Sequence, residues 1–228
     1  MGKMILSKRL MKKRNIGRSV VIIMIMKWIK CQVNEENKRT FSKAQEGWGK
    51  LRHCDGFIGQ IGGWNRNEPY EAGILSVWKD LHCYQSFMQH QHDEIFGKSD
   101  QGGTYTNISV DIFESISNIG TTDITDFVDK GKLLRVAECS VEKDKRARFE
   151  QVLKEAGNRG MIPGMLSGAF GKRQNGGYLV SSKWDNEDSH QRYADKELPA
   201  LINDSGVKDS PQRISVSLIE LHSKWAVI

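Results

Sequence analysis

The sequence lacks the features that would place it quickly in a functional class. Its longest apolar run covers residues 20–26, far short of the roughly 20 residues that cross a bilayer, so no membrane span is predicted. The four cysteines are scattered, with no CxxC pair and no zinc spacing. Such thiols are typical of a reducing cytoplasm, the expected location. No P-loop, nucleophile elbow or paired-carboxylate motif is present.

Acidic residues are missing from the first 18 positions, which hold seven lysines and arginines. Since the whole chain carries +6, residues 19–228 carry −1, without the signature of a basic DNA-binding domain. No DNA partner is therefore expected. The tail has several possible explanations: contact with RNA or a membrane surface, disorder, or a true start at Met24 or Met26. A secretion signal is disfavoured because no small-residue cleavage site follows.

The sequence does contain an internal repeat, the first thing to seek before a fold is assigned. One constant offset of 108 holds up to a turn that is two residues shorter in the second half, and an offset of 106 holds after it. Equivalent residues are Cys31 and Cys139, Phe41 and Phe149, Gly56 and Gly164, then Trp78 and Trp184, Gln85 and Gln191, and Glu114 and Glu220.

Each half predicts the order βαββαβ. The first half predicts strands at 21–31, 56–64, 71–78 and 107–115, with amphipathic helices at 35–52 and 81–95. The second half predicts strands at 133–141, 164–172, 178–184 and 213–221, with helices around 149–156 and after 185. This order gives a four-stranded antiparallel sheet with both helices on one face. The bare face must be covered, and the second copy can cover it.

We therefore predict an α+β fold: tandem ferredoxin-like repeats that form a pseudo-dimeric α+β barrel within one chain. The predicted organisation is a basic tail at 1–18, a first unit at 19–117, a linker at 118–130 and a second unit at 131–228. The assembly expected is a monomeric pseudo-dimer or a homodimer of it.

This pattern, with a Trp that closes the third strand, resembles the dimeric α+β barrel superfamily. That group includes antibiotic-biosynthesis-type and haem-degrading monooxygenases. The segments 55–64 and 90–96 are more narrowly similar to the YdbC-like proteins of bacilli. The resemblance covers about residues 24–225, and it implies the fold more strongly than any activity.

Haem-degrading members of the superfamily use an Asn on the first strand, a Trp on the third and a His on the second helix. By this resemblance Trp78 takes the Trp position, and His90 or His92 the His position. The first strand holds no Asn, and the second half has Lys196 opposite His90. Haem is therefore a possible cofactor only for the first half. No metal site is expected, because side chains two apart on a helix point about 200° away from each other.

The candidate ligand-binding residues are Trp28, Trp64 and Tyr84, since aromatic pockets suit flat organic molecules. Each aromatic residue also has a structural interpretation as core packing. The primary hypothesis is a small-molecule-binding or non-catalytic module. The alternative is a monooxygenase that acts on a planar aromatic substrate or haem, with His90, His92 and Trp78 as catalytic residues. The tryptophans and histidines found in one half alone place the site in the first half.

Overall fold

The computed structural model describes residues 23–119, 131–158, 162–173, 175–205 and 211–228. Within these residues the strands close into a barrel in the order β1-β3-β2-β8-β5-β7-β6-β4. The first half contains β1 (Ile25–Gln32), α1 (Lys38–Glu46), β2 (Phe57–Asn65), β3 (Glu71–Trp78), α2 (Leu81–His90), α3 (His92–Ser99) and β4 (Asn107–Ile119). The second contains β5 (Leu133–Val141), α5 (Arg146–Asn158), β6 (Met165–Lys172), β7 (Gly177–Trp184), α6 (Glu187–Arg192), α7 (Leu198–Ser205) and β8 (Pro211–Leu221). The predicted tandem α+β barrel is confirmed. The basic tail and most of the proposed linker lie outside the described residues.

The repeat is visible in the strand register as well as in the sequence. The pairing of β2 with β3 shifts between Phe57 and Gly59, and the pairing of β6 with β7 shifts between Met165 and Ser167. These two irregularities are 108 residues apart, the offset found in the sequence. A bulge bends its strand and strengthens the local twist, so both halves bend their sheets at the same point.

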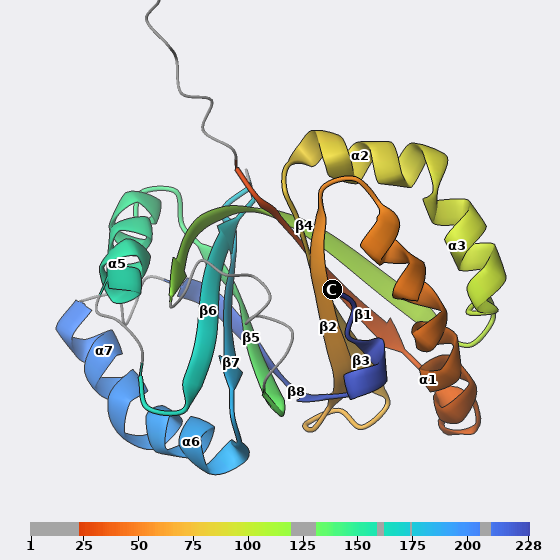
Figure 1. The fold of residues 1–228 in the computed structure, drawn as a ribbon. Helices are drawn as coiled ribbons and strands as arrows, with labels where there is room; N and C mark the ends of the chain where they lie inside the picture. The colour runs from red at the N-terminus through yellow and green to blue at the C-terminus, as the bar shows by residue number, and fades with distance from the viewer. Residues whose placement is uncertain (1–22, 120–130, 159–161, 174, 206–210) are drawn as a thin grey trace, which may run out of the picture.

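The two long helices predicted in the first half are both interrupted. A short 3-10 helix precedes α1, and a second one covers Gly47–His53, where two glycines weaken the α-helix. The predicted helix at 81–95 is two helices, since Gln91 leaves the α-helical conformation at φ −130° and ψ −26°. The break turns α3 away from the axis of α2 (Figure 1). His92, the first residue of α3, thereby packs between three aromatic rings.

The barrel interior is filled by apolar side chains from both halves. One cluster joins Met26, Trp28, Ile61, Leu75 and Phe113 to Leu134, Val136, Ala169, Leu179 and Ile219. The helices lie outside, with α1–α3 over one half of the barrel and α5–α7 over the other (Figure 1). Each half therefore buries one face of its sheet against the opposite half and the other face against its own helices.

A polar pair inside the barrel shows that the halves are specialised for each other. Lys30 Nζ lies 2.6 Å from Glu138 Oε2, which also accepts a 3.2 Å hydrogen bond from Trp28 Nε1. Lys30 and Glu138 are equivalent positions, 108 residues apart. In a dimer of identical halves this contact would bring like side chains together, whereas the single chain brings opposite charges together. The pair supports a barrel closed within one chain.

Candidate functional site

A cavity of about 480 Å³ lies between the outer face of the first-half sheet and the helices that cover it. Its floor is formed by residues of β1, β2, β3 and β4, and its roof by residues of α1, α2, α3 and the 3-10 helix after α1. The volume falls within the range of small-molecule pockets, about 300–1,000 Å³. Aromatic and aliphatic side chains make up most of the lining. Such a lining favours a flat, largely apolar ligand.

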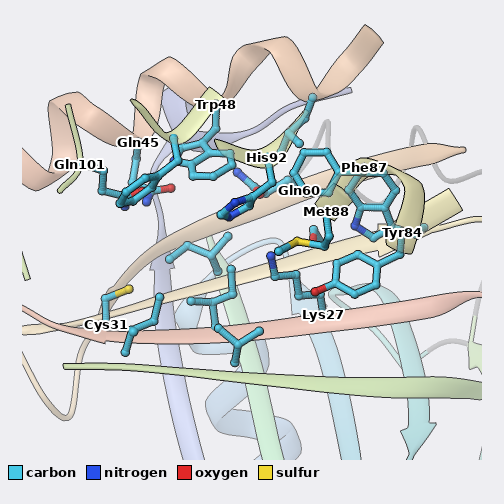
Figure 2. A pocket seen from close by; sticks show the side chains of 18 of the residues that line it. Lys27, Cys31, Gln45, Trp48, Gln60, Tyr84, Phe87, Met88, His92 and Gln101 are labelled. Carbon is cyan, nitrogen blue, oxygen red and sulfur yellow. The ribbon is translucent and has the colours of Figure 1, made fainter. Parts of the chain in front are cut away.

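His92 forms the centre of the aromatic roof. Its ring centroid lies 5.7 Å from those of Trp48 and Phe87, and it stacks on Phe96 at 6.0 Å with an interplanar angle of 6°. Its Nδ1 lies 2.8 Å from Asp93 Oδ1. Because a carboxylate only accepts hydrogen bonds, Nδ1 donates this one, and in the neutral ring Nε2 is then the acceptor nitrogen. The packing and the hydrogen bond together fix the orientation of the ring. In Figure 2 the imidazole points down into the cavity, opposite Lys27.

A row of three polar side chains crosses the floor. Lys27 on β1 pairs with Ser76 on β3, and Ser76 pairs with Gln60 on β2. All three line the cavity and are buried. Residues paired directly across strands have Cβ atoms about 4.5–5.5 Å apart, so the three side chains are neighbours. We call them the polar row.

Lys27 is the only lysine or arginine in the cavity lining. It is 7% exposed, and its ammonium lies over the Tyr84 ring, whose centroid is 5.5 Å from Nζ. Burial removes water from the ammonium and lowers the pKa of Lys27 to about 8, although the neighbouring Cys31 opposes the shift. The same desolvation raises the pKa of Cys31 to about 12. The cavity therefore holds an amine that can gain or lose a proton near neutral pH, and a thiol that stays protonated.

Two further donors in the lining have no partner. Gln60 Nε2 and Trp78 Nε1 are buried and make no hydrogen bond within the described residues. An unpaired buried donor destabilises a fold by roughly 1–3 kcal/mol, so such groups call for an explanation. A ligand with an oxygen acceptor would supply one.

The structure brings together some of the predicted site residues and separates others. Trp78, Tyr84 and His92 all line the cavity. His90 ends α2 with its side chain exposed, outside the lining. Trp28 lies on the other face of the sheet, in the barrel interior. Trp64 belongs to a separate cluster around Phe41 and Trp225, with ring centroids 5.7 and 5.6 Å away.

Lys27 and Gln60 were not among the residues predicted from the sequence. Lys27 shares one face of its strand with Ile25, Ile29 and Cys31. A single charged residue on an otherwise apolar face could have indicated a binding site. Gln60 is a large polar residue among the glycines of β2. Neither residue belongs to a motif, and the chemistry follows only from the register that joins them.

Haem requires more of this cavity than its residues provide. His92 offers an imidazole nitrogen, and the first strand turns Lys27 rather than an Asn to the cavity. Haem also carries two propionates, whereas the lining supplies one cation. The residues therefore fit a smaller ligand with one acceptor group, and we derive no step through haem. The described residues contain no group of three or more His, Cys, Asp or Glu that could hold a metal ion. No helix among them is long and apolar enough to cross a membrane.

Comparisons with known proteins agree with this architecture. Residues 25–113 match the family described as Domain of unknown function (DUF4937). The chain is 40% identical over 93 residues to "Uncharacterized protein YdbC" of Bacillus subtilis (strain 168), a match that covers 40% of this chain and 78% of that protein. The matched family domain is the half that contains the cavity.

Solved structures show a similar fold over most of the chain. A proposed monooxygenase from Lactobacillus acidophilus has a TM-score of 0.69 at 13% identity, covering 90% of this chain and 98% of its own. A proposed monooxygenase from Fusobacterium nucleatum has a TM-score of 0.70 at 12% identity, covering 88% and 93%. An anthrone oxidase-like protein has a TM-score of 0.62 at 10% identity, covering 88% and 91%. At these identities the likeness concerns the fold alone.

Proposed function

Because the chain belongs to the DUF4937 family of YdbC-like proteins, and the family domain spans the cavity-bearing half, we propose that it binds a small flat molecule in this cavity. The observation that carries the proposal is a cavity of about 480 Å³ with an aromatic roof and a single polar row across its floor. Apolar walls with few polar groups are the usual composition of small-molecule sites. The walls would hold the ring system, and the polar row would set its orientation.

The test is calorimetric titration of the full chain with planar bicyclic and tricyclic aromatics, beginning with 7-methoxycoumarin. Trp48→Ala removes a roof aromatic and copies the residue at the equivalent position, Ala156. We expect it to weaken binding about tenfold, the equivalent of about 1.4 kcal/mol. His90→Ala alters an exposed histidine outside the lining and is the matched control. Absence of binding by every planar compound, or equal affinity in Trp48→Ala, would contradict the proposal.

A second candidate is oxidation of the bound molecule by dioxygen, as in a monooxygenase. Two groups that can transfer protons, Lys27 and His92, line the same cavity. In such a reaction an acidic CH₂ of the substrate becomes C=O, one oxygen atom enters the product and the other leaves as water. The substrate supplies the four electrons that dioxygen accepts. Trp78 would form the wall beside the reacting ring, and His92 would carry the proton.

Oxygen uptake with an anthrone tests this candidate, since one structural neighbour is described as anthrone oxidase-like. We expect one dioxygen consumed per substrate, loss of most of the rate in His92→Leu, and an unchanged rate in His90→Ala. His92→Leu copies Leu198, the residue at the equivalent position. Uptake no faster than in protein-free buffer would reject catalysis for this substrate class and leave the binding proposal intact.

A further inference from the structure

Three N–H groups of the cavity share a lack of acceptors. Gln60 Nε2 and Trp78 Nε1 are buried without a hydrogen-bond partner in the described chain, and Lys27 Nζ faces the Tyr84 ring, 5.5 Å from its centroid, rather than an oxygen acceptor. Each side chain is more than nine-tenths buried, at 4%, 1% and 7% exposed respectively. A site with surplus donors is complementary to a ligand with surplus acceptors, because every unpaired donor would then gain a partner.

The buried charge of the lining is positive, which also favours a ligand that accepts hydrogen bonds. Its titratable side chains besides Lys27 are Cys31, Tyr84, His92, Asp93 and Tyr105. Desolvation raises the pKa of Cys31, Tyr84 and Tyr105, so these groups stay neutral near neutral pH. The Asp93 side chain is 98% exposed and its carboxylate is hydrogen-bonded to His92. The ammonium of Lys27 thus has no buried counter-charge in the lining.

The register places the donors where a flat ligand would meet them edge-on. Lys27, Ser76 and Gln60 lie side by side across three strands, and Trp78 follows Ser76 on the same face of β3. On the other side of the polar row, Ile29 pairs with Ile74, so the floor becomes aliphatic. The ring system of a ligand can lie between the aliphatic floor and the aromatic roof only if its polar edge faces the row.

We propose that the polar row is an oxygen-anion site, which selects flat ligands that carry a phenolate, enolate or carboxylate. The inference rests on the proposed function, because it names the chemical class of the ligand for the same cavity. The Lys27 ammonium supplies the counter-charge, and Gln60 and Trp78 donate hydrogen bonds. A phenol or enol loses its proton on binding, either to the Lys27 amine or to solvent, and no other bond changes.

The titration of Lys27 supports this assignment. Burial lowers the pKa of Lys27 to about 8, because desolvation disfavours the ammonium. A bound anion would restore the pKa toward its ordinary value, since opposite charges stabilise each other in a poorly hydrated site. Affinity for a permanent anion should therefore fall as the pH rises above about 8, where the free protein loses the ammonium.

Matched coumarins test the proposal. 7-Hydroxycoumarin ionises and 7-methoxycoumarin does not, while coumarin-3-carboxylate is a carboxylate throughout the neutral range. The hydroxycoumarin anion also has its own long-wavelength excitation band. We expect the full chain to bind the hydroxyl or carboxylate probe about ten- to a hundredfold more tightly than the methoxy probe, the range that a charge-assisted hydrogen bond gives. If only the hydroxyl probe binds more tightly than the methoxy probe, the site selects phenolates or enolates; if only the carboxylate probe does, it selects carboxylates.

Two readouts distinguish an anion site from simple packing. Bound 7-hydroxycoumarin should show the anion band at about pH 6, where most of the free probe is neutral, and Lys27→Met should abolish that band. Lys27→Arg should retain it, and Arg135→Met, at the equivalent position of the second half, should leave it unchanged. If Lys27→Met fails to fold, Gln60→Gly, which copies Gly168, should weaken the two anionic probes and spare the methoxy probe.

The outcomes separate this inference from the function on which it rests. Equal affinity for all three probes, with no anion band, would overturn the anion site and keep the proposed function. Anion selectivity that survives in Lys27→Met would also overturn it. Failure of all three probes to bind, together with the wider panel of planar aromatics, would overturn both.

Discussion

The two halves of the barrel share one backbone plan but differ in the side chains that each sheet turns toward its own helices. By the repeat, the positions of the polar row Lys27–Ser76–Gln60 are taken in the second half by Arg135, Ser182 and Gly168, which pair across the strands in the same way. The glycine removes the amide altogether. The serine accepts a 2.9 Å hydrogen bond from Trp184 Nε1, whereas the equivalent Trp78 Nε1 has no partner among the described residues.

The helices over the two sheets differ in the same way. The aromatic roof residues Trp48 and His92 correspond to Ala156 and Leu198. Tyr84 corresponds to His190, which is buried and whose two ring nitrogens make no hydrogen bond within the part of the chain that the structure describes. Burial lowers the pKa of His190, with Arg135 adding to the shift, which favours the neutral imidazole. The comparison teaches that the repeat fixes the elements, and that function is to be sought among the positions where the halves differ.

The largest expected effect concerns the buried charge. At pH 7 Lys27→Met should stabilise the fold by about 3 kcal/mol, because the folded protein no longer desolvates an ammonium. The pKa of Lys27 falls from 10.5 to about 8 on folding, so the unfolded chain binds more protons between these values. The stability of the wild type should therefore rise with pH over this window, relative to Lys27→Met.

Urea unfolding of both proteins at pH 7 and at about pH 10.5 measures this difference. The matched control is Arg135→Met, a half-buried position at which we expect a smaller change. A Lys27→Met protein as stable as the wild type at pH 7, with no convergence at high pH, would show that Lys27 is solvated in the folded state.

A second comparison concerns the seams between the halves. A Cβ on Gly63, where β2 meets β8, would lie 1.8 Å from the backbone oxygen of Glu220. A Cβ on the equivalent Gly171, where β6 meets β4, would lie 2.8 Å from Phe113 Cβ and 3.1 Å from Met26 Sδ. The backbone oxygen near Gly63 is held by the strand, whereas the side-chain atoms near Gly171 can shift. We expect Gly63→Ala to destabilise by about 3 kcal/mol and Gly171→Ala by about 1 kcal/mol.

Thermal and urea unfolding of the two alanine variants provide the measurement. Equal destabilisation would mean that both seams adapt alike. A larger destabilisation by Gly171→Ala than by Gly63→Ala would show that the contact between β6 and β4 is the more rigid of the two.

The smallest expected effect separates the two corner tryptophans. Trp184→Phe leaves Ser182 without its donor, whereas Trp78→Phe removes a donor for which the described structure shows no acceptor. Both substitutions remove similar volume from fully buried sites. Trp184→Phe should therefore be about 1 kcal/mol more destabilising than Trp78→Phe. Paired urea titrations test the difference, and an equal or opposite ranking would remove the hydrogen-bond argument.

The fold could be predicted from the sequence because it is encoded twice. The two constant offsets, 108 and 106, reappear in the strand register and in the shared irregularity at Phe57–Gly59 and Met165–Ser167. Apolar alternation showed that Met26 and Trp28 share a face of β1. It could not show which face closes the barrel, since both faces of this sheet are buried. Trp28 accordingly packs in the interior, away from the cavity.

The cavity could be predicted only in part. Trp78 and the helix after it mark its position, and Tyr84 and His92 were among the candidates. The conformation of Gln91 decides which histidine faces inward, and an uninterrupted helix at 81–95 does not contain that information. The polar row depends on the register of three strands, so no local pattern could reveal that Lys27 and Gln60 converge.

A crystal structure of the full chain with 7-hydroxycoumarin would show directly whether the polar row binds an oxygen anion. We expect one probe in the first-half cavity, its ring between the aromatic roof and the sheet. Its hydroxyl oxygen should lie about 2.7–2.9 Å from Lys27 Nζ, the distance of a charge-assisted hydrogen bond. A probe bound in the second half, or one in the first half with its oxygen turned away from the polar row, would contradict this expectation.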